Sequence, residues 1–275
     1  MTTFRQIVAL TRLSMRRLMF TRFMFSNLLL ASLPVIMLVV IAVSMKLGNM
    51  SGPGLPDLHQ GLERMLRFFY LHFIIFFVAT VSGFAIVRQD LDDRTLHYIV
   101  LAPVKRWAVT ISKFIAFWIL SAAILLASYW ATYLSACLIV AGPSATVRDL
   151  FGEAGWFGNL VRESCVIVLA LTTYGAIGMA MGSVFKSLVF APILWVWEAT
   201  LPWLPAGLKL LALSHYFQSM LPVKVTEKQR MLEILADPAS LTLSLTVLAC
   251  VTAISIAIAL LVNLWRECAY IEEQA

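Results

Sequence analysis

Long apolar runs alternate along the chain with short segments that hold most of its charged residues. A helix crosses the bilayer core, about 30 Å thick, in about 20 residues, and six runs approach or exceed that length. The pattern predicts an all-α, polytopic membrane protein with six transmembrane helices in a single transmembrane domain over residues 1–275. The predicted spans are residues 23–44, 68–87, 107–141, 163–185, 187–205 and 241–264.

The first segment outside these spans is residues 1–22, which hold five arginines and no acidic residue. On a helical wheel, Arg5, Arg12 and Arg16 lie along the flank of an apolar side. A basic amphipathic helix of this kind lies in the plane of the membrane surface. We therefore expect residues 1–22 to form an interfacial helix at the inner leaflet.

A second segment, residues 207–240, lies between the last two spans. Its residues 208–221 are mainly apolar and are bounded by Gly207 and Pro222. Apolar stretches of about 10–14 residues are too short to span and are commonly re-entrant or interfacial. The pattern predicts a short re-entrant or interfacial helix in an outer region.

Composition excludes a soluble protein. Of 275 residues, 61% are hydrophobic and 13% are charged, whereas soluble domains average about 45–50% and about 25%; the mean hydropathy is +0.87. The net charge of +6 does not indicate nucleic-acid binding, because the basic residues lie at the ends of apolar runs. Four scattered cysteines contain no CxxC pair, so neither a disulfide framework nor a zinc site is expected.

Basic residues also predict the orientation of the chain, since cytoplasmic loops are enriched in lysine and arginine. With six spans, the rule is satisfied when both termini are cytoplasmic. The basic residues then on the inner side are the five arginines of the N-terminal segment and Arg88, Arg94, Lys105, Arg106, Lys113, Lys186 and Arg266.

The most specialised interruption is residues 88–106, between the second and third spans. Three acidic residues, Asp90, Asp92 and Asp93, are bracketed by Arg88 and Arg94. Apolar residues between the charges would give a helix one apolar side. The segment is therefore expected to form a short helix at the membrane surface whose charged side faces a cytoplasmic partner.

This segment resembles the cytoplasmic coupling segment of the ABC-2 family, the permease subunits of many bacterial ABC exporters. The family pattern is an acid cluster, a Thr-Leu pair, a Pro-Val pair, a basic pair and a lysine in the next helix. The matching residues are Asp90, Asp92, Asp93, Thr95, Leu96, Pro103, Val104, Arg106 and Lys113. Arg94, His97 and Ser112 replace the usual glycine, glutamate and glycine.

The resemblance implies a multi-pass protein of the bacterial inner membrane that dimerises with a second copy or a paralogue. It also implies separate ABC ATPase subunits, which carry the ATP and magnesium. The residues expected to contact the ATPase are Asp90, Asp92, Asp93, Arg94, Thr95, Leu96, Pro103 and Arg106. The family counterpart of residues 208–221 is a pair of short helices, expected to form part of an outer gate.

No nucleotide or metal site is expected in the chain itself. The sequence contains no Gly-x-x-x-x-Gly-Lys-Ser/Thr loop, so it cannot hold a nucleotide phosphate in the P-loop manner. Its four histidines show no metal-ligand spacing, and neither HExxH nor a nucleophile elbow occurs. We therefore expect a transport subunit that is not an enzyme and holds no cofactor.

Polar residues within the third span have two interpretations. Ser121, Ser128 and Ser135 recur every seven residues, with Tyr129 and Thr132 nearby. Small residues at this spacing form close-packing seams between helices in lipid. Alternatively, the polar stripe lines a path for the substrate, with Ser128, Tyr129, Thr132 and Ser135 as its candidate residues.

Glu198 is the one acidic residue expected deep in the membrane, where a carboxylate is costly unless it is protonated, paired or hydrated. It is either a structural hydrogen-bonding group, with Tyr129 or Thr132 as a partner, or part of the substrate path.

The preferred function is that of a permease exporting a hydrophobic or amphipathic substrate, drug-like or lipid-like. Its alternatives are an intramembrane enzyme or assembly factor acting on a lipid-linked substrate, and a proton-coupled carrier.

Overall fold

The computed structural model describes residues 3–19, 21–47, 61–92, 106–141, 156–185, 187–200, 206–221 and 239–272. All regular structure in these residues is helical, which confirms the predicted all-α class. The helices are α1 (Thr3–Met19), α2 (Arg22–Leu47), the π-helix η1 (Leu66–Ile75), α4 (Phe76–Asp92), α6 (Arg106–Ala141), α8 (Trp156–Val184), α9 (Phe190–Thr200), α10 (Ala206–Lys209), α11 (Leu213–Ser219) and α13 (Leu241–Glu272).

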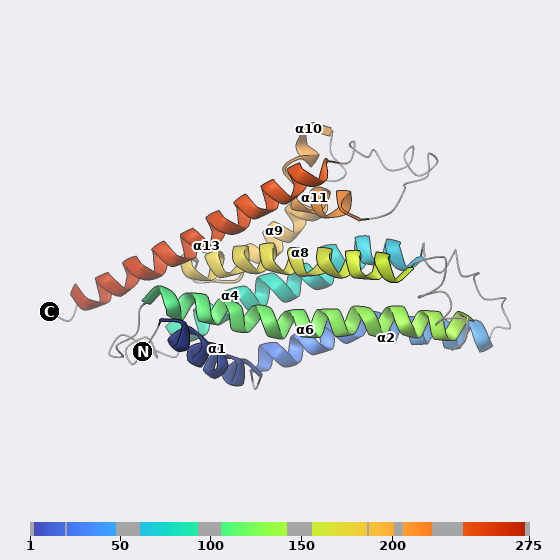
Figure 1. The fold of residues 1–275 in the computed structure, drawn as a ribbon, viewed down its shortest axis with the longest axis horizontal. Coiled ribbons are helices and arrows are strands. Elements are labelled where there is room, and N and C mark those ends of the chain that lie inside the picture. Colours follow the sequence, from blue (N-terminus) through green and yellow to red (C-terminus); the bar gives the residue numbers. More distant parts are fainter. Residues whose placement is uncertain are drawn as a thin grey trace.

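The long helices run roughly along the longest axis of the molecule, and α1 lies obliquely at one end (Figure 1). Within the described residues, five helices are long and apolar enough to cross a membrane. Their spanning segments are Met24–Ile41, Gly61–Arg88, Trp107–Ile139, Trp156–Val184 and Leu241–Asn263. These correspond to the predicted first, second, third, fourth and sixth spans.

Two predicted boundaries were wrong. The second and fourth spanning helices begin at Gly61 and Trp156, each seven residues before the expected start. The added turns hold charged residues, such as Glu63 and Arg162, which lie outside the predicted spans. Glu163, the first residue of the predicted fourth span, is buried and hydrogen-bonded to Tyr129, and a paired carboxylate can be accommodated inside a helical bundle.

The predicted fifth span, residues 187–205, is described as a helix only over the 11 residues of α9. At about 1.5 Å per residue such a helix is about 16 Å long, too short to cross alone. Residues 201–205 lie outside the described part of the chain. The single short helix predicted over residues 208–221 is instead two short helices, α10 and α11, separated by a turn at residues 210–212.

The tightest contact in the bundle joins α4 and α8. A Cβ atom built on Gly178 would lie 2.8 Å from the Cα atom of Thr80, and one on Gly182 would lie 2.6 Å from the carbonyl oxygen of Phe84. From the side of α4, a Cβ atom built on Gly83 would lie 2.5 Å from the carbonyl oxygen of Gly175 in α8. Glycine at these positions therefore lets the two backbones touch, as small residues do in membrane helices.

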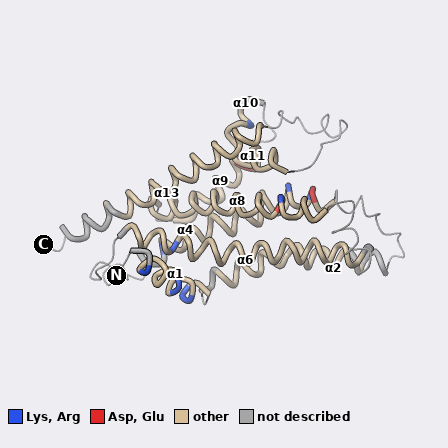
Figure 2. The backbone as a smooth tube through the Cα atoms, in the orientation of Figure 1, with Lys and Arg blue, Asp and Glu red and all other residues tan. Residues whose placement is uncertain are grey.

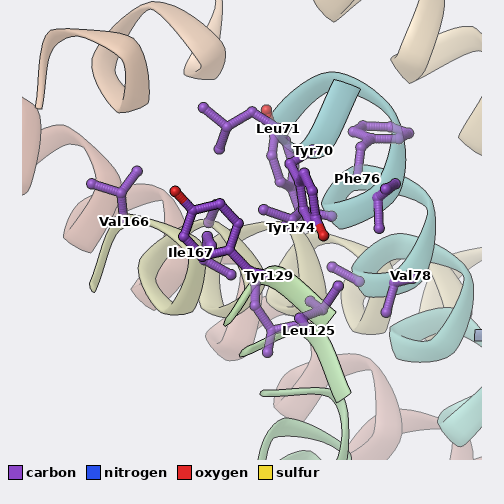
Figure 3. Packing of buried hydrophobic residues seen from close by; sticks show 14 of the residues in the cluster. Tyr70, Leu71, Phe76, Val78, Leu125, Tyr129, Val166, Ile167 and Tyr174 are labelled. Atoms are coloured by element: carbon purple, nitrogen blue, oxygen red, sulfur yellow. The ribbon is translucent and has the colours of Figure 1, made fainter. Parts of the chain in front are cut away.

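Large buried side chains surround this contact, mainly from η1, α4, α6 and α8; those labelled in Figure 3 include Tyr70, Phe76, Leu125 and Ile167. Helices α2 and α13 lie at the outside of this core. Only 22% and 17% of the residues in their spanning segments are buried. Their exposed side chains are mostly apolar, so these faces are suited to contact with lipid.

Charge is segregated along the molecule, as Figure 2 shows. Arginines gather at the end occupied by α1, and the middle of the long helices is almost free of described charged residues. A second, mixed group of acidic and basic residues lies on the opposite ends of α8 and of the helix that contains η1. Two charged ends separated by an apolar middle are typical of a bundle that spans a bilayer.

The glycine contact predicts opposite effects for two alanine substitutions in α8. Gly178→Ala forces apart α4 and α8 and should lower the free energy of unfolding by about 1–3 kcal/mol. Gly158→Ala is the matched control, because a Cβ there meets nothing within 4 Å and alanine is the better helix former. Thermal unfolding of the two purified variants measures both effects. Equal stability of the two would contradict the packing described here.

Candidate functional site

A first polar cluster, the Tyr70 node, joins η1, α6 and α2 and consists of Tyr70, Ser128, Thr132 and the Ala31 carbonyl group. The Tyr70 hydroxyl lies 3.0 Å from both Ser128 Oγ and Thr132 Oγ1. Ser128 donates a hydrogen bond to the Ala31 carbonyl oxygen of α2, and Thr132 donates one of 2.8 Å to the Ser128 carbonyl oxygen. Two of the candidate path residues thus lie together and link three helices.

Local helix geometry explains why polar groups gather here. Pro34 lies inside α2; a proline removes one backbone hydrogen bond of the preceding turn and displaces its carbonyl groups. The Ala31 carbonyl belongs to that turn, and Ser128 gives it a donor. Such side-chain donors are what make proline tolerable in a transmembrane helix.

The facing helix η1 is irregular too, because it is a π-helix over ten residues. Side chains supply partners to its carbonyl groups: His72 Nδ1 lies 2.8 Å from the Arg67 carbonyl oxygen, and the Trp195 indole of α9 donates a bond of 2.7 Å to the His72 carbonyl oxygen. π-Helical segments occur frequently at functional sites. The Tyr70 node thus lies between two helices that both depart from regular α geometry.

Tyr129 forms a second contact beside the Tyr70 node. Its ring packs edge-on against Tyr70 with centroids 5.4 Å apart (Figure 3). Its hydroxyl donates to Glu163 of α8, and both side chains are buried. Glu63, Tyr133 and Asn159 line the same small pocket. The contact ties α6 to α8 near the mixed charged end of the bundle.

Glu198 forms a third cluster, the Glu198 node, with Tyr174 and the first turn of α11. Its Oε1 accepts the Leu213 N–H at 3.0 Å, and its Oε2 accepts the Ser214 N–H at 3.1 Å and the Tyr174 hydroxyl at 3.5 Å. The residue preceding α11, Ala212, provides no side-chain cap. The buried carboxylate therefore acts as the N-terminal cap of α11 from 15 residues away in sequence.

The expected partners of Glu198, Tyr129 and Thr132, were wrong. Both hydroxyls bind other groups, and the N–H groups at the start of α11 have no intrahelical partner, so they bind the carboxylate instead. Ser135 is half-buried and donates to the Thr132 carbonyl oxygen at 3.0 Å, within its own helix. Of the five candidate path residues, three lie at or beside the Tyr70 node and Glu198 lies at its own node.

Tyr70, Glu163 and Tyr174 are members of these clusters that the sequence alone does not identify. Each lies in a predicted span or at its edge, where its neighbours show no polar periodicity. The available signal was the cost of a buried phenol or carboxyl group in lipid, which predicts a partner without identifying it.

Both ends of the predicted coupling segment lie at the end of the molecule that holds α1 (Figure 1). Asp90 and Asp92 are in the last turns of α4, and Arg106 is the first residue of α6. The other predicted contact residues, Asp93, Arg94, Thr95, Leu96 and Pro103, lie outside the described part of the chain.

The Glu198 node predicts an order of stability. Glu198→Leu leaves two backbone N–H groups and a phenol without an acceptor, each worth about 1–3 kcal/mol when buried, whereas Glu198→Gln keeps one acceptor oxygen. The thermal unfolding temperature should therefore be highest for the parent, lower for Glu198→Gln and lowest for Glu198→Leu. Thr200→Ala, an exposed change in the same helix, is the control and should have little effect. A Leu variant as stable as the parent would show that the cap is unimportant.

Comparison with known proteins adds independent information. The family model described as ABC-2 family transporter protein matches residues 18–197, from the last turn of α1 into α9, which is more than half of the chain. No curated protein matches the chain. The matched region contains the Tyr70 node, the Glu163 contact and both helix ends that flank the predicted coupling segment. The chain therefore belongs to the ABC-2 transporter family.

Proposed function

We propose that this chain is the transmembrane permease subunit of an ATP-driven ABC exporter. The observation that carries the proposal is the family match over residues 18–197. The permease dimerises with a second copy or a paralogue and moves a hydrophobic or amphipathic substrate, drug-like or lipid-like, out of the cytoplasm or the inner leaflet. ATP and magnesium are bound by separate ATPase subunits.

The ATPase contacts the coupling segment, residues 88–106. The contact residues are the acidic cluster of this segment and the basic residues at its end. Support comes from the position of the segment between the end of α4 and the start of α6. Because α4 and α8 touch along their backbones at Gly178 and Gly182, a push on the end of α4 moves both helices as one body. Closure of the ATPase dimer thereby drives alternating access.

The outer gate in this proposal is formed by residues 208–221. The Glu198 node supports this role, because one carboxylate joins α9 to α11 and, through Tyr174, to α8. Motion of α8 is therefore transmitted to α11. The candidate path residues Ser128, Tyr129, Thr132 and Ser135 lie on α6, next to the same moving pair.

The orientation has both termini cytoplasmic, in the bacterial inner membrane. In the six-span topology the fifth crossing is the predicted span of residues 187–205, of which the structure describes residues 187–200. The basic end that holds α1 then faces the cytoplasm, as the positive-inside rule requires.

Charge reversal in the coupling segment tests the partner. Asp92→Lys with Asp93→Lys should abolish copurification of the ATPase, because the lysines repel the basic groups expected opposite the acids, while membrane insertion is unchanged. Arg64→Glu is the control: it reverses an exposed charge near the start of the continuous helix, residues 61–92, that ends at Asp92. An intact complex with normal ATP turnover in the double variant would remove the basis for the assignment.

Cysteine labelling tests the six-span topology. In a background without the four native cysteines, Ser187→Cys lies between α8 and α9 and Ser240→Cys immediately precedes α13; both positions are exposed. A membrane-impermeant maleimide added from outside should label Ser240→Cys at once and Ser187→Cys only after permeabilisation. The same accessibility at both positions would mean that the intervening segment does not cross the membrane.

A further inference from the structure

The surface of α1 that faces away from the bundle carries a row of arginines. Arg5, Arg12 and Arg16 are exposed, and at about 100° per residue they fall within about 40° of one another around the helix. A different side of the helix packs on α6: Thr11 is buried, and its hydroxyl lies 3.4 Å from the Ser112 carbonyl oxygen. There is no acidic residue in α1 to neutralise the row.

Exposed apolar side chains flank this arginine row. Val8 and Met19 lie on one side of it and Leu13 on the other, with 52%, 54% and 63% of their surfaces exposed. A purely aqueous surface or a nucleic-acid partner would not favour three large apolar groups beside the cations. The combination fits a bilayer interface, where apolar side chains enter the acyl boundary and arginine stems extend their guanidinium groups to the headgroups.

The direction of the arginine row is fixed by the corner between α1 and α2. The Thr21 N–H and hydroxyl both bond to the Leu18 carbonyl oxygen, at 3.0 and 2.7 Å. Next in the chain, Asn27 of α2 donates a hydrogen bond of 2.6 Å to Ser82 of α4. These hydrogen bonds at Thr21, Asn27 and Thr11 hold α1 against the bundle. In this orientation its arginines face away from the protein.

We propose that Arg5, Arg12 and Arg16 form a binding surface for the phosphate headgroups of anionic phospholipids. The guanidinium fork matches a phosphate in geometry and charge, and a headgroup with net negative charge is attracted where a zwitterionic one is not. Since Thr11 of α1 contacts Ser112 in the second turn of α6, lipid bound here stabilises the helix that follows the coupling segment. The inference rests on the membrane location of the chain and on neither its cargo nor its ATPase.

Competitive lipid retention tests this surface on the full-length chain. The purified protein in mild detergent is incubated with equal amounts of phosphatidylglycerol and phosphatidylcholine, and the retained lipids are quantified by native mass spectrometry. Each basic residue near an anionic surface contributes about a fivefold preference. We therefore expect phosphatidylglycerol to be enriched, and the enrichment to fall at least tenfold when all three arginines are replaced by glutamine. It should also decrease in 0.5 M salt, because exposed charges are then screened.

Two single variants provide a charge-matched comparison. Arg12→Gln should lower the enrichment about fivefold, whereas Arg64→Gln, which removes an exposed arginine from the far end of the bundle, should leave it unchanged. Equal retention of both lipids by the parent overturns the proposal. So does a triple variant that keeps the parent's enrichment while its thermal unfolding is unaltered, since the lipid would then bind elsewhere. If the parent protein retained phosphatidylglycerol preferentially but transported no substrate, that result would count against the proposed function and not against this lipid surface.

Discussion

The backbone contact between α4 and α8 is the constraint on which the rest of the bundle depends. Lipid tails are as apolar as leucine, so membrane helices gain little from apolar burial alone and associate through close packing and hydrogen bonds. Gly83, Gly178 and Gly182 remove the side chains that would separate these two helices. The long contact that results orders the large side chains around it, from Phe76 of α4 to Ile167 of α8.

The remaining helices pack on this pair through apolar side chains, and individual polar contacts add to that packing. Ser128 connects α6 to the turn of α2 that precedes Pro34, Asn27 connects α2 to α4, and Trp195 connects α9 to the carbonyl group of His72. Each contact satisfies a group that would be costly to leave unpaired in an apolar environment. The bundle thus combines one pair of helices in backbone contact with further helices joined to it by packing and by single hydrogen bonds.

The sequence was sufficient to predict the helical class, the five long spans and the family, because each depends on the length of an apolar run or on a local motif. It was insufficient where long-range partners decide the structure. The predicted second and fourth spans begin after Glu63 and Arg162, although the helices continue through both residues. The partner of Glu198 lies 15 residues away in a turn with no periodicity, and the π-helical form of residues 66–75 leaves no apolar pattern that differs from an α-helix.

That π-helix has a geometric consequence. A π-turn contains more residues than an α-turn, so η1 holds surplus chain relative to a regular helix of the same length. If one such turn became α-helical, the surplus residue would pass along the helix. Everything before it, including Glu63 and Arg64, would then rotate by about 100° relative to α4. The backbone hydrogen bonds would change register without a loss in their number. In the structure, the π-helix therefore sets the angle at which residues 61–65 are presented relative to α4, which is packed on its glycine neighbour α8.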